Sequence, residues 1–202
     1  MRGFLNIGLC LFLLCLWGCG PSAKLPPLPG EAKVLAFGDS LTYGTGAGSG
    51  QSYPDLLGGM IGRDIVNAGI PGETSAEGLV RLPELLDEYQ PALLILCHGG
   101  NDFLRNLGEK GAEDNLRAMV KLARERGVDV VLIAVPSFGL TLSPPDLYER
   151  IAGEFALPIE TGTLSRIIRD PGLKSDSVHP NAAGYKLLAE AVAERLKAAG
   201  AI

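Results

Sequence analysis

Residues 33–42, Lys-Val-Leu-Ala-Phe-Gly-Asp-Ser-Leu-Thr, decide the fold class of this chain. Val34 to Phe37 form a short run that is apolar on both faces, which is typical of a strand buried in a parallel sheet. Gly38 follows the run and allows a tight turn from a strand into a helix. Runs of the same kind predict about five strands in all, at residues 34–37, 64–67, 93–97, 128–135 and 157–160.

Longer amphipathic segments lie between these runs and predict helices. They cover residues 53–61, 75–89, 112–126, 145–155 and 180–199. Pro83 falls inside the second segment and predicts a kink or a break there, because proline lacks the N–H that an α-helix needs. The alternation predicts a single-domain α/β fold, an open parallel sheet with helices on both faces, as in flavodoxin. Ligands of such sheets bind beyond the carboxyl ends of the strands.

Composition limits the classes to which the chain can belong. Its 202 residues, 47% hydrophobic and 20% charged, suffice for one full hydrophobic core. The formal net charge is −5, and charges of both signs alternate along the helical segments. Nucleic-acid binding needs a basic patch, so this pattern argues against a nucleic-acid partner.

The first residues differ in composition from the rest of the chain. One cation, Arg2, precedes an almost wholly apolar stretch at residues 5–17, and this pattern predicts a signal peptide over residues 1–18. The stretch is too short for a convincing transmembrane helix. Residues 16–19, Leu-Trp-Gly-Cys, resemble the bacterial lipobox, although tryptophan is unusual at its second position. The resemblance implies lipidation of Cys19; simple secretion and a retained N-terminal anchor are the alternatives.

The lipobox also implies a location. A lipidated Cys19 would hold the protein on the periplasmic side of a bacterial cell envelope. Gly20 lacks the aspartate that often retains such lipoproteins at the inner membrane, which favours the outer membrane. Residues 19–31 are rich in proline and have no periodicity, so they predict an extended tether to a domain at residues 32–202. Cys97 lies in an apolar run, which predicts a small buried side chain.

Ser40 lies at the turn after the first predicted strand, at the edge of the sheet where ligands bind. A serine hydroxyl becomes a good nucleophile when an imidazole held by a carboxylate takes its proton. The chain has two histidines, and His179 follows Asp176 by three residues on one predicted loop. Each feature also has an ordinary explanation. Glycine-serine turns are common, and Asp176 could begin a turn while His179 precedes a helix that starts with proline.

Acyl transfer also needs hydrogen-bond donors for the negative charge that develops on the carbonyl oxygen. Two loops that follow predicted strands offer such donors. Residues 67–75 include Gly72, whose backbone N–H no side chain obstructs, and residues 98–102 include Asn101, whose side-chain amide is a neutral donor. Either loop alone could be an ordinary connection.

In order, these segments resemble the four sequence blocks of the SGNH (GDSL) hydrolase family. The blocks are residues 38–41 (Gly-Asp-Ser-Leu), 67–74, 99–102 (Gly-Gly-Asn-Asp) and 176–180 (Asp-Ser-Val-His-Pro). The match runs from about Lys33 to the C-terminus. Within it, residues 82–86 and 90–91 are similar to bacterial periplasmic esterases, thioesterases and lysophospholipases and to the arylesterases close to them.

The resemblance implies a serine esterase. Ser40 would be the nucleophile, His179 the general base, and Asp176 the carboxylate that holds the imidazole. The oxyanion hole would consist of the Ser40 N–H, the Gly72 N–H and the Asn101 side chain. The substrate would be a carboxylic ester or thioester with an acyl or aryl group, lysophospholipids included. The mechanism that the resemblance implies uses no metal and no organic cofactor, and we expect a monomer.

Several other functions share some of these features. Residues 44–50 are rich in glycine but contain neither a strict G-x-G-x-x-G nor a P-loop ending, so they predict a flexible rim of the cleft and not a nucleotide site. An α/β-hydrolase should have G-x-S-x-G around Ser40, and the second glycine is absent. A flavodoxin-like electron carrier would not require the triad residues. A carbohydrate acetyl-esterase and a non-catalytic lipoprotein binding module stay open as alternatives.

Two further expectations concern the surroundings of the site. His98 stands where similar family members often carry a larger apolar residue, and we expect it to pack at the end of a strand and to form structural hydrogen bonds. Residues 102–111 and 136–145 follow two of the predicted strands, so we expect them to line the acyl pocket. Apolar side chains at residues 103–107 favour acyl groups of short to medium length, while Arg105 fits a solvated loop equally well.

Overall fold

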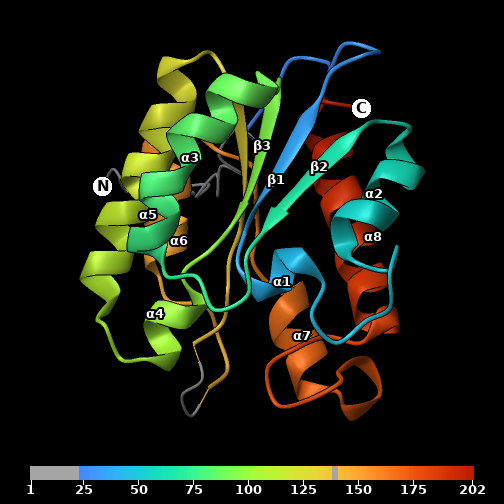
Figure 1. The fold of residues 1–202 in the computed structure, drawn as a ribbon, viewed down its shortest axis with the longest axis vertical. Helices are drawn as coiled ribbons and strands as arrows, with labels where there is room; N and C mark the ends of the chain where they lie inside the picture. The colour runs from blue at the N-terminus through green and yellow to red at the C-terminus, as the bar shows by residue number, and fades with distance from the viewer. Residues whose placement is uncertain (1–22, 138–140) are drawn as a thin grey trace, which may run out of the picture.

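The structure is a computed structural model that describes residues 23–137 and 141–202. A five-stranded sheet forms its centre, and all neighbouring strands are parallel, in the order β2-β1-β3-β4-β5 (Figure 1). The strands are β1 (Val34–Gly38), β2 (Ile65–Gly69), β3 (Leu93–Cys97), β4 (Asp129–Ile133) and β5 (Ile159–Glu160). The predicted α/β fold class is confirmed, and the strand order is that of flavodoxin.

Helices cover both faces of the sheet. They are α1 (Ser40–Tyr43), α2 (Tyr53–Ile61), α3 (Ser75–Tyr89), α4 (Gly100–Leu104), α5 (Glu109–Glu125), α6 (Leu147–Phe155), α7 (Thr163–Arg169) and α8 (Ala182–Ala199), with a 3₁₀ turn η1 (Pro171–Leu173). Helices α3, α5 and α6 lie on one side of the sheet and α2 and α8 on the other (Figure 1). Strands β1 and β3 are buried along their whole length between these layers.

Of the kink or break predicted at Pro83, the break is wrong, because helix α3 runs through the proline. A proline inside a helix destabilises it by about 3 kcal/mol, because one hydrogen bond is lost and the ring crowds the preceding turn. Leu82 and Leu86 lie on either side of the proline, and both are buried. Each buried leucine contributes about 1.5–3 kcal/mol, so packing against the core offsets the effect of the proline.

The register of β1 with its two neighbours, β2 and β3, brings the carboxyl ends of these three strands to one level. Gly38 pairs with Gly69 on β2 and with Cys97 on β3. The loops that follow these strands therefore meet at one edge of the sheet. Gly38 is required there, since a Cβ at this position would lie 2.0 Å from the carbonyl oxygen of Cys97. Cys97 itself is a buried free thiol, as expected.

The expected tether is partly wrong. Leu25 and Leu28 belong to the hydrophobic core. The Leu25 N–H donates to Ala199 O at 3.0 Å, at the end of α8, and the Leu28 N–H donates to Ala201 O at 2.8 Å, just beyond it. Proline-rich composition does not reveal that two leucines three residues apart are bound to the domain. The folded unit therefore begins by Leu25.

The expected signal peptide and Cys19 lie outside the described residues. Across residues 23–137 and 141–202, no helix is both long enough and apolar enough to cross a membrane.

Candidate active site

Ser40 is the first residue of α1, directly after the turn that ends β1. Asp39 caps this helix, because its Oδ1 accepts a hydrogen bond from Leu41 N at 3.0 Å. The hydroxyl of Tyr185, on α8, donates to Thr45 O at 2.8 Å and lies 3.4 Å from Ser40 O, near enough to share that hydrogen. The serine backbone is thus held both by its own helix and by α8.

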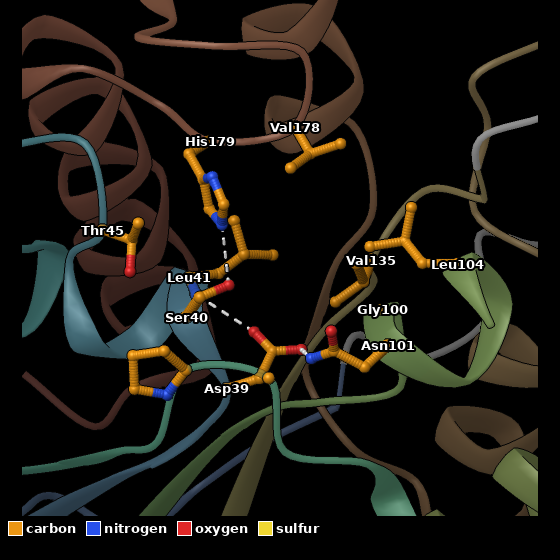
Figure 2. Close-up of a pocket in the computed structure, with 12 residues that line it drawn as sticks. Asp39, Ser40, Leu41, Thr45, Gly100, Asn101, Leu104, Val135, Val178 and His179 are labelled. Carbon is orange, nitrogen blue, oxygen red and sulfur yellow. Dashed lines mark hydrogen bonds between the residues drawn. The ribbon is translucent and has the colours of Figure 1, made fainter.

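His179 and Asp176 lie on the loop between η1 and α8 and reach Ser40 from there. The distance from His179 Nε2 to Ser40 Oγ is 2.9 Å (Figure 2). The distance from His179 Nδ1 to Asp176 Oδ2 is 2.7 Å. The second carboxylate oxygen, Asp176 Oδ1, accepts hydrogen bonds from Val178 N and His179 N, both at 2.8 Å. The sequence-predicted serine, histidine and aspartate therefore form one hydrogen-bonded series.

The charge state of Asp176 fixes the tautomer of His179. Burial alone would raise the pKa of this carboxyl, but the hydrogen bonds from the His179 ring and from two backbone N–H groups outweigh it and lower the pKa to about 2. An ionised carboxylate only accepts hydrogen bonds, so the proton of the neutral ring lies on Nδ1. The lone pair on Nε2 is then free to accept the hydroxyl proton of Ser40.

Asn101 is hydrogen-bonded to Asp39, which precedes Ser40, and to Glu73, which follows Gly72. It follows Gly100 at the start of α4, and its Nδ2 donates to Glu73 O at 2.9 Å and, over a longer distance of 3.3 Å, to Asp39 Oδ2. Burial raises the pKa of the Asp39 carboxyl, and the hydrogen bond from Leu41 N offsets only part of that rise. Both amide hydrogens of Asn101 therefore have partners in the structure.

Gly72 lies on the loop after β2, in the left-handed region with φ of +82°. Arg105, at the end of α4, donates through Nη2 to Gly72 O at 2.6 Å. Asp102 ties the same two regions together, since its carboxylate accepts from Ser75 N at 2.8 Å and from Ser75 Oγ at 2.6 Å at the start of α3. The two predicted oxyanion loops are thus linked directly.

These residues surround one cavity of about 230 Å³. Ser40, Gly72, Asn101 and His179 all line it. The rest of its wall consists of Asp39, Leu41, Thr45, Pro71, Gly100, Leu104, Val135 and Val178 (Figure 2). Five of these are the apolar side chains Leu41, Pro71, Leu104, Val135 and Val178.

The expected acyl-pocket loops are only partly correct. Of residues 102–111 only Leu104 lines the cavity, and none of the described residues of 136–145 does. The wall comes instead from residues next to the reactive groups, such as Leu41 and Val178. Residues 138–140 lie outside the described part of the chain. The glycine-rich segment does contribute to the rim, through Thr45.

His98 is buried at the end of β3, as expected, and does not line the cavity. Its Nδ1 accepts a hydrogen bond from Gly99 N at 3.0 Å, and its Nε2 lies 3.1 Å from Glu73 Oε2. The sequence analysis assigned no role to Glu73, although this residue lies within the family block at residues 67–74. In the described part of the chain, no three His, Cys, Asp or Glu side chains come together so as to hold a metal ion.

The fold is a parallel α/β sheet, and a hydrogen-bonded series of serine, imidazole and carboxylate lies at the carboxyl ends of its strands. This is the architecture of a serine hydrolase. Comparison with known proteins narrows this class. Residues 36–187 match the model of the GDSL-like Lipase/Acylhydrolase family. The chain belongs to this family, and it is a serine ester hydrolase.

Named relatives and solved structures agree with the family. An arylesterase of Vibrio mimicus is 33% identical over 175 residues, which cover 81% of this chain and 88% of the relative. Esterase TesA of Pseudomonas aeruginosa is 32% identical over 197 residues, 91% of this chain and 97% of the relative. The crystal structure of the esterase EstA from Pseudoalteromonas sp. has a TM-score of 0.74 at 26% identity and covers 83% of this chain and 97% of its own.

Proposed function

We propose that Ser40, His179 and Asp176 are the catalytic triad of this ester hydrolase. Ser40 Oγ attacks the acyl carbonyl while His179 Nε2 takes its proton, and the same imidazolium then protonates the leaving alkoxide or thiolate. Asp176 stabilises the imidazolium and keeps its orientation. The acyl-enzyme is hydrolysed by a water that His179 deprotonates in turn. The observation that carries this proposal is the series of 2.9 Å and 2.7 Å contacts from serine through imidazole to carboxylate.

The oxyanion hole in this proposal consists of the backbone N–H groups of Ser40 and Gly72 and the side-chain amide of Asn101. Their common position around one cavity with His179 supports the assignment. Asn101 has to give up one of its two present partners to serve an oxyanion. The 3.3 Å contact with Asp39 is the longer and weaker of the two, so it is the one that an oxyanion replaces.

The substrate that fits this site best is an aryl or acyl ester with a short to medium acyl chain. The apolar walls supplied by Leu104, Val135 and Val178 favour a hydrocarbon or aromatic group next to the reacting carbonyl. The names arylesterase and esterase, carried by two relatives, agree with this choice. Thioesters and lysophospholipids are further candidates, because the resemblance to thioesterases and lysophospholipases includes residues 82–86 and 90–91.

A series of p-nitrophenyl esters from acetyl to palmitoyl tests the substrate. We expect kcat/KM to peak between butyryl and octanoyl and to fall for palmitoyl, since a cavity of about 230 Å³ lined by apolar side chains has little room for a long acyl chain. A peak at acetyl, with activity on acetylated glycans, would favour a carbohydrate esterase instead. No hydrolysis of any ester by the folded protein would favour the non-catalytic binding module.

We further propose that residues 1–18 are a signal peptide and that Cys19 is lipidated, which would hold the domain in the bacterial cell envelope on the periplasmic side of the outer membrane. The lipobox-like residues 16–19 support this proposal. Labelling of expressing cells with radioactive palmitate should mark the wild-type chain and not a Cys19→Ser variant. Equal labelling of both would contradict it. The domain works as a monomer in this proposal, because one chain supplies every residue of the triad and the oxyanion hole.

A further inference from the structure

The carboxylate of Glu73 is buried next to the proposed oxyanion hole and has three hydrogen-bond donors. Glu73 is 7% exposed and immediately follows Gly72. Arg81, on α3, binds it with two parallel hydrogen bonds, Nε to Oε1 and Nη2 to Oε2, both 2.7 Å long. His98 Nε2 lies 3.1 Å from Oε2. Burial alone would raise the pKa of Glu73, but the hydrogen bonds from Arg81 and His98 lower it below its usual value.

The orientation of His98 is fixed at both nitrogens. Because Gly99 N–H donates to Nδ1, the ring proton of the neutral imidazole lies on Nε2, where it donates to Glu73. The space for this bond depends on Gly78 of α3, since a Cβ there would lie 2.5 Å from His98 Nε2. His98 is therefore a neutral donor to Glu73 and reaches it through a gap that a glycine leaves open.

Arg81 is itself held on two sides. Its Nη2 also donates to Ala68 O at 3.0 Å, and its guanidinium lies 4.3 Å from the centroid of the Phe37 ring. The Phe37 ring also faces His98, with centroids 5.8 Å apart. Strand β1, the loop after β2, helix α3 and the end of β3 thus converge on the Glu73 carboxylate.

Glu73 connects this cluster to the reaction site through its backbone. Its carbonyl oxygen accepts the 2.9 Å hydrogen bond from Asn101 Nδ2. We propose that Glu73, held by Arg81 and His98, is a positioning residue that fixes the side-chain amide of Asn101 in the oxyanion hole. This inference rests on the proposed role of Asn101.

The chemistry of the amide explains why such an anchor matters. A carboxamide nitrogen has two hydrogens in one plane with its oxygen, so fixing one hydrogen on Glu73 O determines where the other points. The second hydrogen is directed toward Asp39 Oδ2, beside the cavity (Figure 2). An oxyanion donor is effective when it is oriented before the reaction, because no reorganisation is then needed in the transition state. A loosened Glu73 would let the amide rotate and lose this advantage.

The competing explanation is that the cluster only stabilises the fold. A buried ion pair often contributes little net stability, while removing one partner destabilises the protein because the other charge is left unpaired. A loss of stability in a Glu73 variant therefore does not separate the two explanations. A loss of kcat that depends on Asn101 does.

A double-mutant cycle makes this separation. We expect Glu73→Gln to lower kcat for p-nitrophenyl butyrate by roughly 10- to 100-fold with little change in KM, because a small displacement of a reacting or stabilising group has effects of this size. Asn101→Ala should lower kcat by on the order of 100-fold or more. In the double variant the two factors should not multiply: once Asn101 is absent, Glu73→Gln should lower kcat by only about two- to threefold.

Two further variants complete the experiment. His98→Leu removes one donor without changing the charge, and it should lower kcat severalfold even if Glu73→Gln fails to fold; its factor should also shrink when Asn101 is absent. Glu113→Gln is the matched control, because Glu113 accepts hydrogen bonds from Arg117 and Arg150 between α5 and α6 and does not line the cavity. It should lower the melting temperature and leave kcat unchanged.

The outcomes distinguish this inference from the proposed function. The positioning role would be overturned if the reductions of kcat by Glu73→Gln and Asn101→Ala multiplied in full in the double variant. It would also be overturned if His98→Leu and Glu73→Gln both had the kcat of the wild type. Neither result would affect the roles of Ser40 and Asn101. A wild-type kcat in Asn101→Ala would instead overturn the proposed oxyanion hole. In each series, the rate of the wild type is measured beside that of Ser40→Ala. The difference between the two shows that the assay reports the reaction of the serine.

Discussion

Replacing Ser40 with alanine is expected to lower kcat for p-nitrophenyl butyrate by a factor on the order of 10⁵, leaving a slow residual rate. In a serine hydrolase the triad acts as a unit, and loss of the nucleophile alone removes nearly all of its effect. Residual rate remains because an oxyanion hole and substrate binding still assist attack by water. Initial rates measured over several hours with freshly purified protein would detect a residual rate of this size.

Stability of the Ser40→Ala variant should match that of the wild type. The hydroxyl donates to His179 Nε2 at 2.9 Å, but the backbone contacts that hold residue 40, from Tyr185 and from the capped helix α1, do not involve the side chain. Equal melting temperatures would show that the lost rate is chemical. Hydrolysis above a tenth of the wild-type rate by the variant would exclude Ser40 as the nucleophile.

Much of the fold was predictable because burial and periodicity determine it locally. Helix α2 has the predicted bounds Tyr53–Ile61, and α3 begins at Ser75 as expected, where Thr74 and Glu77 form a reciprocal capping box. Strand β4 ends at Ile133, although the apolar run continues to Val135. Val135 lines the cavity, so an apolar run cannot tell a strand residue from a residue that contacts substrate. Short helices such as α4 and α7 were missed, since five to seven residues are too few for a periodic pattern.

The reactive residues were predictable for a different reason. Ser40, Asp176 and His179 are residue types that chemistry requires, and they occur in short segments whose order can be read directly. Glu73 and Arg81 are eight residues apart, and their partner His98 comes from another strand. Nothing local distinguishes their charges from those of a solvated helix face. Only the folded arrangement shows that they meet behind Asn101.

Replacing Asp176 with asparagine is expected to lower kcat by roughly 10³-fold with little loss of stability. The asparagine Oδ1 can still accept the hydrogen bonds from Val178 N and His179 N, so the loop keeps its shape. Its amide would then present a donor to His179 Nδ1, which forces the ring proton onto Nε2. A ring in that tautomer cannot take the proton of Ser40. The factor is smaller than for Ser40→Ala because the Asp176 side chain is 52% exposed, and water can replace part of its stabilisation of the imidazolium.

The pH dependence gives a second test of the same residue. The pKa of Asp176 is about 2 in the folded protein, so the carboxylate stays ionised throughout a practical assay range and should contribute no proton to the acid limb of kcat/KM. A folded pKa below the ordinary value of 3.8 stabilises the protein above that pH, and the contribution is lost as the pH falls toward about 2. Any difference in melting temperature between wild type and Asp176→Asn should therefore shrink over this interval. An Asp176→Asn variant with wild-type kcat would show that His179 is oriented without the carboxylate. Loss of wild-type activity through protonation of Asp176 within the assay range would contradict its low pKa.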